Sequence, residues 1–309
     1  MFALEKYTGM KSRYACPQCG HRHQFARYVN TETGEYVDDN VGCCNRLDKC
    51  GYHRKPKDFF ADNPGANVSS GKPSVSPKAT APLSSTTFDV IPFDLVKKSL
   101  AFSPKSNFHS FLSSQFGKDV SEQKSNQFLF GTSKTEKDAT IFWQVDINNV
   151  AHSGKVILYD PNRGKRGKKI DWVHSKISRK TGKPFTLKQC FFGEHQLATN
   201  PGQTVAIVES EKTAIIASIM LPEYLWLATC GVNGCKWRDK NVASVLLGRK
   251  VVLFPDLGMF DRWSNYASEL QKQLSFDISI SDLVERSTTP VEKESKSGFD
   301  LADYLLKTK

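Results

Sequence analysis

The chain has 309 residues, 39% of them hydrophobic and 24% charged, which fits a globular protein of two domains plus a small module. No apolar run approaches the roughly 20 residues that cross a bilayer, and the N-terminus lacks a signal-peptide pattern, so a cytoplasmic protein without a membrane partner is expected. The formal net charge is +11, and residues 151–190 supply +9 of it, with 11 Lys and Arg against 2 Asp and Glu. This cluster favours a phosphate backbone over an anionic membrane or an inert surface, because no amphipathic helix accompanies it.

The first part of the chain, residues 1–60, has the cysteine spacing of a zinc-binding module. A Cys-x-x-Cys pair is followed, after a loop, by two further cysteines, and four thiolates in a tetrahedron are the commonest structural zinc set. A module this small with few apolar residues needs a metal ion to fold. We therefore expect a zinc ribbon with structural Zn²⁺ on Cys16, Cys19, Cys44 and Cys50. The alternative ligands are Cys43, His21, His23 and His53.

A short hairpin is predicted within this module, from residues 25–29 and 35–37 around Thr33-Gly34. Basic and aromatic side chains accompany the hairpin, and such side chains can neutralise and stack on single-stranded nucleic acid. They are Arg22, Arg27, Arg54, Lys55, Tyr28, Tyr52 and His53. For Tyr28 and Tyr52, covering the small core is an equally good interpretation.

Residues 61–87 are rich in Ser, Pro, Thr and Ala and almost free of large apolar side chains. Such a segment cannot bury enough surface to order itself, so it is predicted to be a flexible linker.

The next part, residues 88–200, is predicted to be a basic mixed α+β subdomain. Apolar side chains spaced by three and four predict two helices within residues 91–116. Short alternating runs at residues 140–146 and 155–159 predict an antiparallel pair of strands. A glycine-rich loop is expected next, and it holds the candidate nucleic-acid-binding residues Arg163, Lys165, Arg166, Lys168 and Lys169.

The last part, residues 201–309, alternates predicted strands with predicted helices. Strands are expected at 205–209, 225–229, 250–255 and 276–280, and helices at 211–220, 239–247, 262–274 and 299–306. Alternation of this kind indicates a mainly parallel sheet with helices on both faces, so the fold class of the chain is α/β.

Two predicted strands of this sheet end in carboxylates, Glu209 and Asp256. Functional groups gather beyond the carboxyl ends of parallel strands, so the two acids are expected to lie side by side and to share Mg²⁺ or Mn²⁺. The alternative is two unrelated turns whose acids interact with helix dipoles, which is the interpretation we favour for Glu211.

The order of these parts resembles bacterial primases of the DnaG type, in particular primase-like proteins of plasmids, phages and transposable elements. Residues 205–214 resemble the first motif of the Toprim domain, in which an apolar strand ends in a metal-associated Glu. Residues 142–159, 169–175 and 192–197 look like the subdomain that precedes Toprim in primases. Residues 299–305 are similar to the acidic segment that closes the domain.

The resemblance implies catalytic roles for Glu209, Asp256 and Lys169, with Asp300 and Asp303 as further Mg²⁺ ligands. The sequence departs from the family pattern at two positions: Ser210 stands where a Gly usually follows the Glu, and Gly258 stands where Asp-x-Asp has its second Asp. One ligand of a two-metal site is therefore missing, and Asp261 or the closing acids are the available substitutes.

The leading hypothesis is a nucleotidyltransferase that makes RNA primers on single-stranded DNA for a mobile element. Its partners would be single-stranded DNA, nucleotides and a replicative helicase. The alternatives are a catalytically inactive Toprim adaptor that binds nucleic acid and a Toprim nuclease that uses the same acids.

Overall fold

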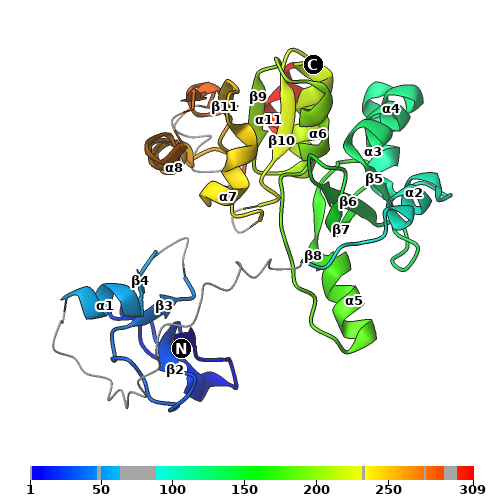
Figure 1. Cartoon of the computed structure of the whole chain (residues 1–309). Helices are drawn as coiled ribbons and strands as arrows, with labels where there is room; N and C mark the ends of the chain where they lie inside the picture. The colour runs from blue at the N-terminus through cyan, green and yellow to red at the C-terminus, as the bar shows by residue number, and fades with distance from the viewer. Residues whose placement is uncertain (1, 47–49, 63–87, 232–233, 275, 289–297) are drawn as a thin grey trace, which may run out of the picture. The chain divides into compact units, whose positions relative to one another are not determined.

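The computed structural model describes residues 2–46, 50–62, 88–231, 234–274, 276–288 and 298–309 (Figure 1). It consists of two compact units, residues 1–82 and 83–309, each described here by itself. The predicted linker lies outside the described residues from residue 63 onward. In the part of the chain that the structure describes, no helix has both the length and the apolar character needed to cross a membrane.

The first unit is a four-stranded antiparallel sheet with its strands in chain order. The strands are β1 (Phe2–Leu4), β2 (Phe25–Asn30), β3 (Gly42–Cys44) and β4 (His53–Arg54), accompanied by the short helices η1 (Met10–Ser12) and α1 (Pro56–Asp62). The predicted hairpin forms, because Val29 bridges Tyr36 in antiparallel fashion and backbone hydrogen bonds join Asn30 to Glu35 and Val37 to Tyr28. Its second arm is too short to count as a strand. The cysteine-bearing strand β3 pairs with the first half of β2, at Phe25–Arg27.

The second unit begins with three helices and an antiparallel sheet in the order β5-β6-β7-β8. The helices are α2 (Phe93–Ala101), α3 (Asn107–Phe116) and α4 (Lys118–Phe128), and the strands are β5 (Phe130–Thr132), β6 (Thr140–Val145), β7 (Ala151–Tyr159) and β8 (Arg166–Trp172). The predicted antiparallel pair is confirmed as β6 and β7. Helix α5 (Val173–Thr181) and the turn η2 (Glu194–Thr199) follow.

The structure of this region differs from the sequence-based prediction in two places. The helix α4 was not predicted, because its sequence is mostly polar and only three of its residues are buried. Residues 166–169 form the start of β8 rather than a loop. Strand β8 is the edge of its sheet and its first five residues are exposed, so it lacks the apolar alternation of a half-buried strand. Exposed lysines are a usual feature of such edge strands.

The rest of the second unit is a parallel sheet in the order β10-β9-β11-β12, which confirms the predicted parallel architecture. Its strands are β9 (Val205–Val208), β10 (Leu225–Ala228), β11 (Val251–Leu253) and β12 (Ile278–Ile280). Its helices are α6 (Glu211–Met220), α7 (Lys240–Ala243), η3 (Ser244–Leu246), α8 (Phe260–Leu274), α9 (Leu283–Arg286) and α11 (Leu301–Thr308). Helices α6 and α11 pack in a core on one face, and α7 and α8 pack in a separate core on the other.

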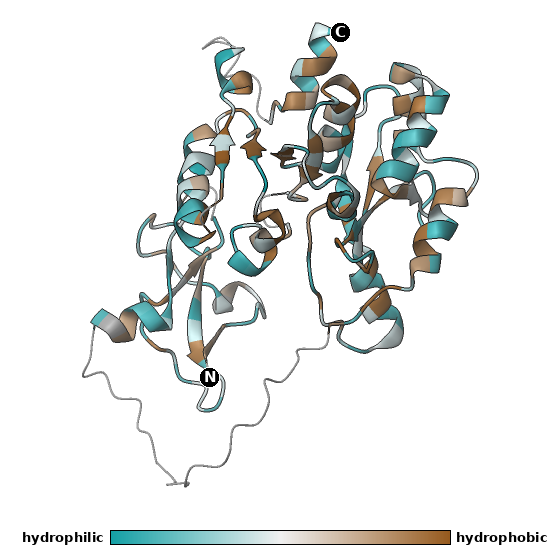
Figure 2. Cartoon of the chain, turned by 45° about the horizontal axis from the view of Figure 1, so that its top comes forward, coloured by the Kyte–Doolittle hydropathy of each residue, from teal (hydrophilic) through white to brown (hydrophobic). Residues whose placement is uncertain are grey.

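One hydrophobic core joins the two sheets of the second unit. It contains Phe142 and Tyr159 from the antiparallel sheet together with Ala206 and Trp226 from the parallel sheet, all nearly without exposure. Figure 2 shows strands of the second unit that are largely hydrophobic and helices in which hydrophobic and hydrophilic stretches alternate. This shared core holds one face of β7 near the start of α6, and that arrangement creates the cavity described below.

Candidate functional site

The four predicted zinc ligands come together in the first unit. The Sγ atoms of Cys16, Cys19, Cys44 and Cys50 all lie within 4.8 Å of one another. Two of the Sγ–Sγ distances are 3.7 Å (Cys16 to Cys50) and 4.0 Å (Cys19 to Cys44). A tetrahedron with Zn–S bonds of about 2.3 Å has edges of about 3.8 Å, so these two distances match a Zn²⁺ site with four thiolate ligands.

The alternative ligands lie outside this cluster among the described residues. The thiol of Cys43 contacts the carbonyl of Cys44, and the His53 ring stacks on Tyr28 and shares a hydrogen bond of 2.9 Å with its hydroxyl. A hydrogen bond from the backbone of His21 is the main reason why the pKa of Cys19 falls to about 6, whereas burial raises the pKa of Cys44 to about 12. Of these two ligands, Cys19 therefore forms the thiolate that zinc needs more readily. Tyr52 packs against Phe25 of the small core.

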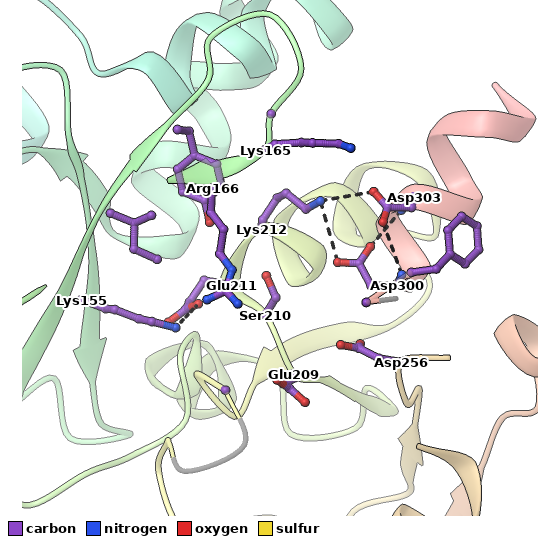
Figure 3. A pocket seen from close by; sticks show the side chains of 16 residues that line it. Lys155, Lys165, Arg166, Glu209, Ser210, Glu211, Lys212, Asp256, Asp300 and Asp303 are labelled. Carbon is purple, nitrogen blue, oxygen red and sulfur yellow. Dashed lines mark hydrogen bonds and ion pairs between the residues drawn. The ribbon is translucent and has the colours of Figure 1, made fainter. Parts of the chain in front are cut away.

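The second unit holds a cavity of about 730 Å³ where the C-terminal ends of β9 and β11 face β7 and the start of β8 (Figure 3). Glu209 directly follows β9 and Asp256 comes three residues after β11, and both line the cavity. The predicted meeting of these two acids at one edge of the sheet is therefore seen in the structure. Parallel pairing of β9 with β11 is the cause, because it brings their carboxyl ends to the same edge.

The two acids influence each other electrostatically. Burial raises the pKa of Asp256 well above its ordinary value, and the negative charge of Glu209 raises it further. A divalent cation between the two carboxylates would relieve this repulsion, and carboxylate oxygens are the ligands that Mg²⁺ and Mn²⁺ prefer. The donor set thus fits the expected metal.

Asp300 and Asp303, the acids of the closing segment, also line the cavity, but both interact with other side chains and with the backbone of the protein. Asp300 caps α11, accepting a hydrogen bond of 2.9 Å from the backbone N–H of Asp303 and one of 2.7 Å from the hydroxyl of Thr213. The ammonium group of Lys212 lies 3.8 Å from Asp300 and 3.5 Å from Asp303. These contacts fasten α11 to α6, and metal ligation by the two acids stays a prediction. Asp261 lies in the first turn of α8 and does not line the cavity.

Only some of the predicted basic residues line the cavity. Lys165 and Arg166 line the cavity, and within the described residues neither has a carboxylate partner at ion-pair distance. Arg163 instead pairs with Asp160 at 2.9 Å. Lys168 and Lys169 are exposed in β8 and do not line the cavity, so the catalytic role expected for Lys169 stays a prediction without support from its position.

The sequence did not predict the ion pair between Lys155 and Glu211, two residues that line the cavity. Lys155 lies in the middle of β7 and its Nζ is 3.1 Å from Oε2 of Glu211, both side chains being almost fully buried. The available signal was a lysine directly before the apolar run of residues 156–159. From the sequence, Glu211 is expected only to interact with the dipole of its helix.

The remaining cysteines are unsuited to nucleophilic chemistry. Cys190, Cys230 and Cys235 are buried, and burial raises the pKa of each thiol above its ordinary value. A thiolate is the reactive form, so all three are best described as core residues.

Comparisons with known proteins agree with the zinc module and leave the rest open. Residues 1–65 match the zinc beta-ribbon finger family, and residues 106–257 match a domain of unknown function, DUF6371. No curated protein matches this chain. Among solved structures, the primase fragment of the bacteriophage T7 primase-helicase protein aligns over 96% of this chain and 94% of its own, with 13% identity and a TM-score of 0.40. This is a distant likeness of fold.

Proposed function

We propose that the cavity is the active site of a metal-dependent nucleotidyltransferase that joins nucleotides into primers on single-stranded DNA. The observation that carries the proposal is the placement of opposite charges on facing walls. Glu209 and Asp256 come from the parallel sheet, while Lys165 and Arg166 come from the turn and edge strand of the antiparallel sheet. Phosphoryl transfer needs this combination, because the protein mainly positions the phosphates and offsets their charge.

The size and charge of the cavity suit a nucleotide. About 730 Å³ lies within the range of roughly 300–1,000 Å³ found for small-molecule sites. Lys165 and Arg166 would bind phosphate oxygens, and the planar guanidinium of Arg166 can do so with two parallel hydrogen bonds. Glu209 and Asp256 would hold Mg²⁺ or Mn²⁺, which would supply activation of the attacking hydroxyl and neutralise the triphosphate.

Single-stranded DNA is the template we propose. The exposed lysines of β8 continue the positive charge beyond the cavity, and a row of cations attracts a phosphate backbone whatever its sequence. A replicative helicase as partner and a mobile element as setting remain predictions from the sequence.

The test is incorporation of labelled ribonucleotides on single-stranded DNA in the presence of Mg²⁺. Wild-type protein should make short products, and Glu209→Gln and Asp256→Asn should make none while keeping their fold and their DNA affinity. Product formation that is unchanged in both variants would reject the site.

An inactive nucleic-acid-binding adaptor is the second candidate. It is favoured by Gly258, which stands where a second metal-binding carboxylate would be needed, with a positive φ of 78° that an aspartate adopts less readily. DNA binding without product growth or DNA cleavage would support the adaptor, and shortening of the labelled DNA would identify a nuclease.

A further inference from the structure

The ion pair between Lys155 and Glu211 is buried, and its hydrogen bonding is incomplete. The side chains retain 9% and 2% of their exposure, and the Nζ–Oε2 distance is 3.1 Å. The second carboxylate oxygen of Glu211, Oε1, is buried and has no hydrogen-bond partner among the described residues. Replacing a buried ion pair by apolar side chains is often neutral or stabilising, so stability alone does not account for this pair.

Its position suggests what the pair does. Both residues line the cavity, and in Figure 3 Lys155 and Glu211 form one wall, beside Ser210 and Arg166. The Lys155 ammonium group donates to Oε2 of Glu211 and, at 3.0 Å, to the carbonyl of Cys230. The Nζ also lies 5.9 Å from the centroid of the Trp172 ring, a cation–π contact that uses no acceptor atom. An ammonium group has three N–H donors, so the two acceptors seen within the described chain leave one donor for a group in the cavity.

We propose that Lys155 binds a phosphate group of the nucleotide and that Glu211 is its positioning residue. This inference rests on the proposed function and assigns a residue that the sequence analysis did not consider. The carboxylate and the Cys230 carbonyl fix the direction of the Lys155 side chain before a ligand arrives, so little conformational entropy is lost on binding. Because β7 carries Lys155 and the turn after it carries Lys165, the two cations would contact the phosphates from one strand and its turn.

The test uses a double variant, Lys155→Met with Glu211→Leu, which removes the charges together and leaves no buried charge unpaired. Thermal unfolding should show a melting temperature equal to or above that of the wild type. Affinity for MgATP and for inorganic triphosphate, measured by calorimetry, should fall about tenfold to hundredfold, the effect of losing one hydrogen bond to a charged group. Lys155→Arg should keep most of the affinity because it keeps a cation at this wall.

A control ion pair of similar geometry is Lys176–Glu136, whose Nζ–Oε1 distance is 3.0 Å, whose side chains are partly exposed and which does not line the cavity. Lys176→Met with Glu136→Leu should leave both affinities unchanged. If the Lys155–Glu211 double variant binds MgATP as tightly as the wild type, the pair is only structural and the inference is wrong, while the proposed function stands. If the wild type binds neither MgATP nor triphosphate, the proposed function fails and this inference fails with it.

Discussion

The salt dependence of DNA binding gives a quantitative test of the basic surface on β8. We consider a variant in which Lys165, Arg166, Lys168 and Lys169 are all alanine. All four side chains are exposed in the folded protein, so their removal leaves the core intact. Arg163 is left unchanged because its guanidinium already pairs with Asp160.

The expected magnitude follows from counterion release. Each phosphate contact with single-stranded DNA contributes about 0.7 to the slope of log affinity against log salt, so losing four contacts lowers the slope by about 2.8. Between about 50 mM and about 200 mM salt, the affinity advantage of the wild type over the variant should then shrink about fiftyfold. Fluorescence anisotropy with a labelled oligonucleotide at several salt concentrations measures both slopes.

The matched control removes four other exposed lysines of the second unit, Lys97, Lys98, Lys250 and Lys272, which lie outside the cavity. This control has the same net charge as the variant, so it separates local contacts from the overall charge of the protein. Equal slopes for the variant and the control would refute the assignment of DNA binding to β8 and the turn before it.

Three further predictions concern the zinc cluster, the acidic edge and a buried glutamate. Purified protein should contain one Zn²⁺ per chain, and chelation should unfold residues 1–60 while the circular dichroism of the second unit persists; metal analysis that finds less than one zinc contradicts this. Mg²⁺ at about 100 times its dissociation constant should stabilise the protein by about 2.7 kcal/mol, measured as a rise in melting temperature. Glu209→Gln and Asp256→Asn should each abolish this rise, and an undiminished rise in either variant counts against the shared metal site. Burial raises the pKa of Glu194 from its ordinary 4.5 to about 7, so its contribution to stability is full below about pH 4.5 and is lost as the pH rises through about 7. The free energy of unfolding should fall by about 3 kcal/mol over this interval in urea titrations, and Glu194→Gln should flatten the profile; a wild-type profile without this fall would show that Glu194 titrates normally.

The sequence by itself determined the local features of this protein. Cys16-x-x-Cys19 with Cys44 and Cys50 specified the zinc cluster, because metal geometry allows few ligand spacings. The apolar runs before Glu209 and Asp256 specified two parallel strands, and the parallel arrangement then required their acids to share an edge.

Only the tertiary structure decided how the two sheets face each other. From the sequence, the first residues of β8 were expected to form a loop, because an exposed edge strand has no apolar alternation. It also gave no means to connect Lys155 with Glu211, which lie 56 residues apart and meet because one hydrophobic core contains residues of both sheets. That long-range packing determines which cations face the acids. Lys155, Lys165 and Arg166 line the cavity, whereas Lys168 and Lys169 do not.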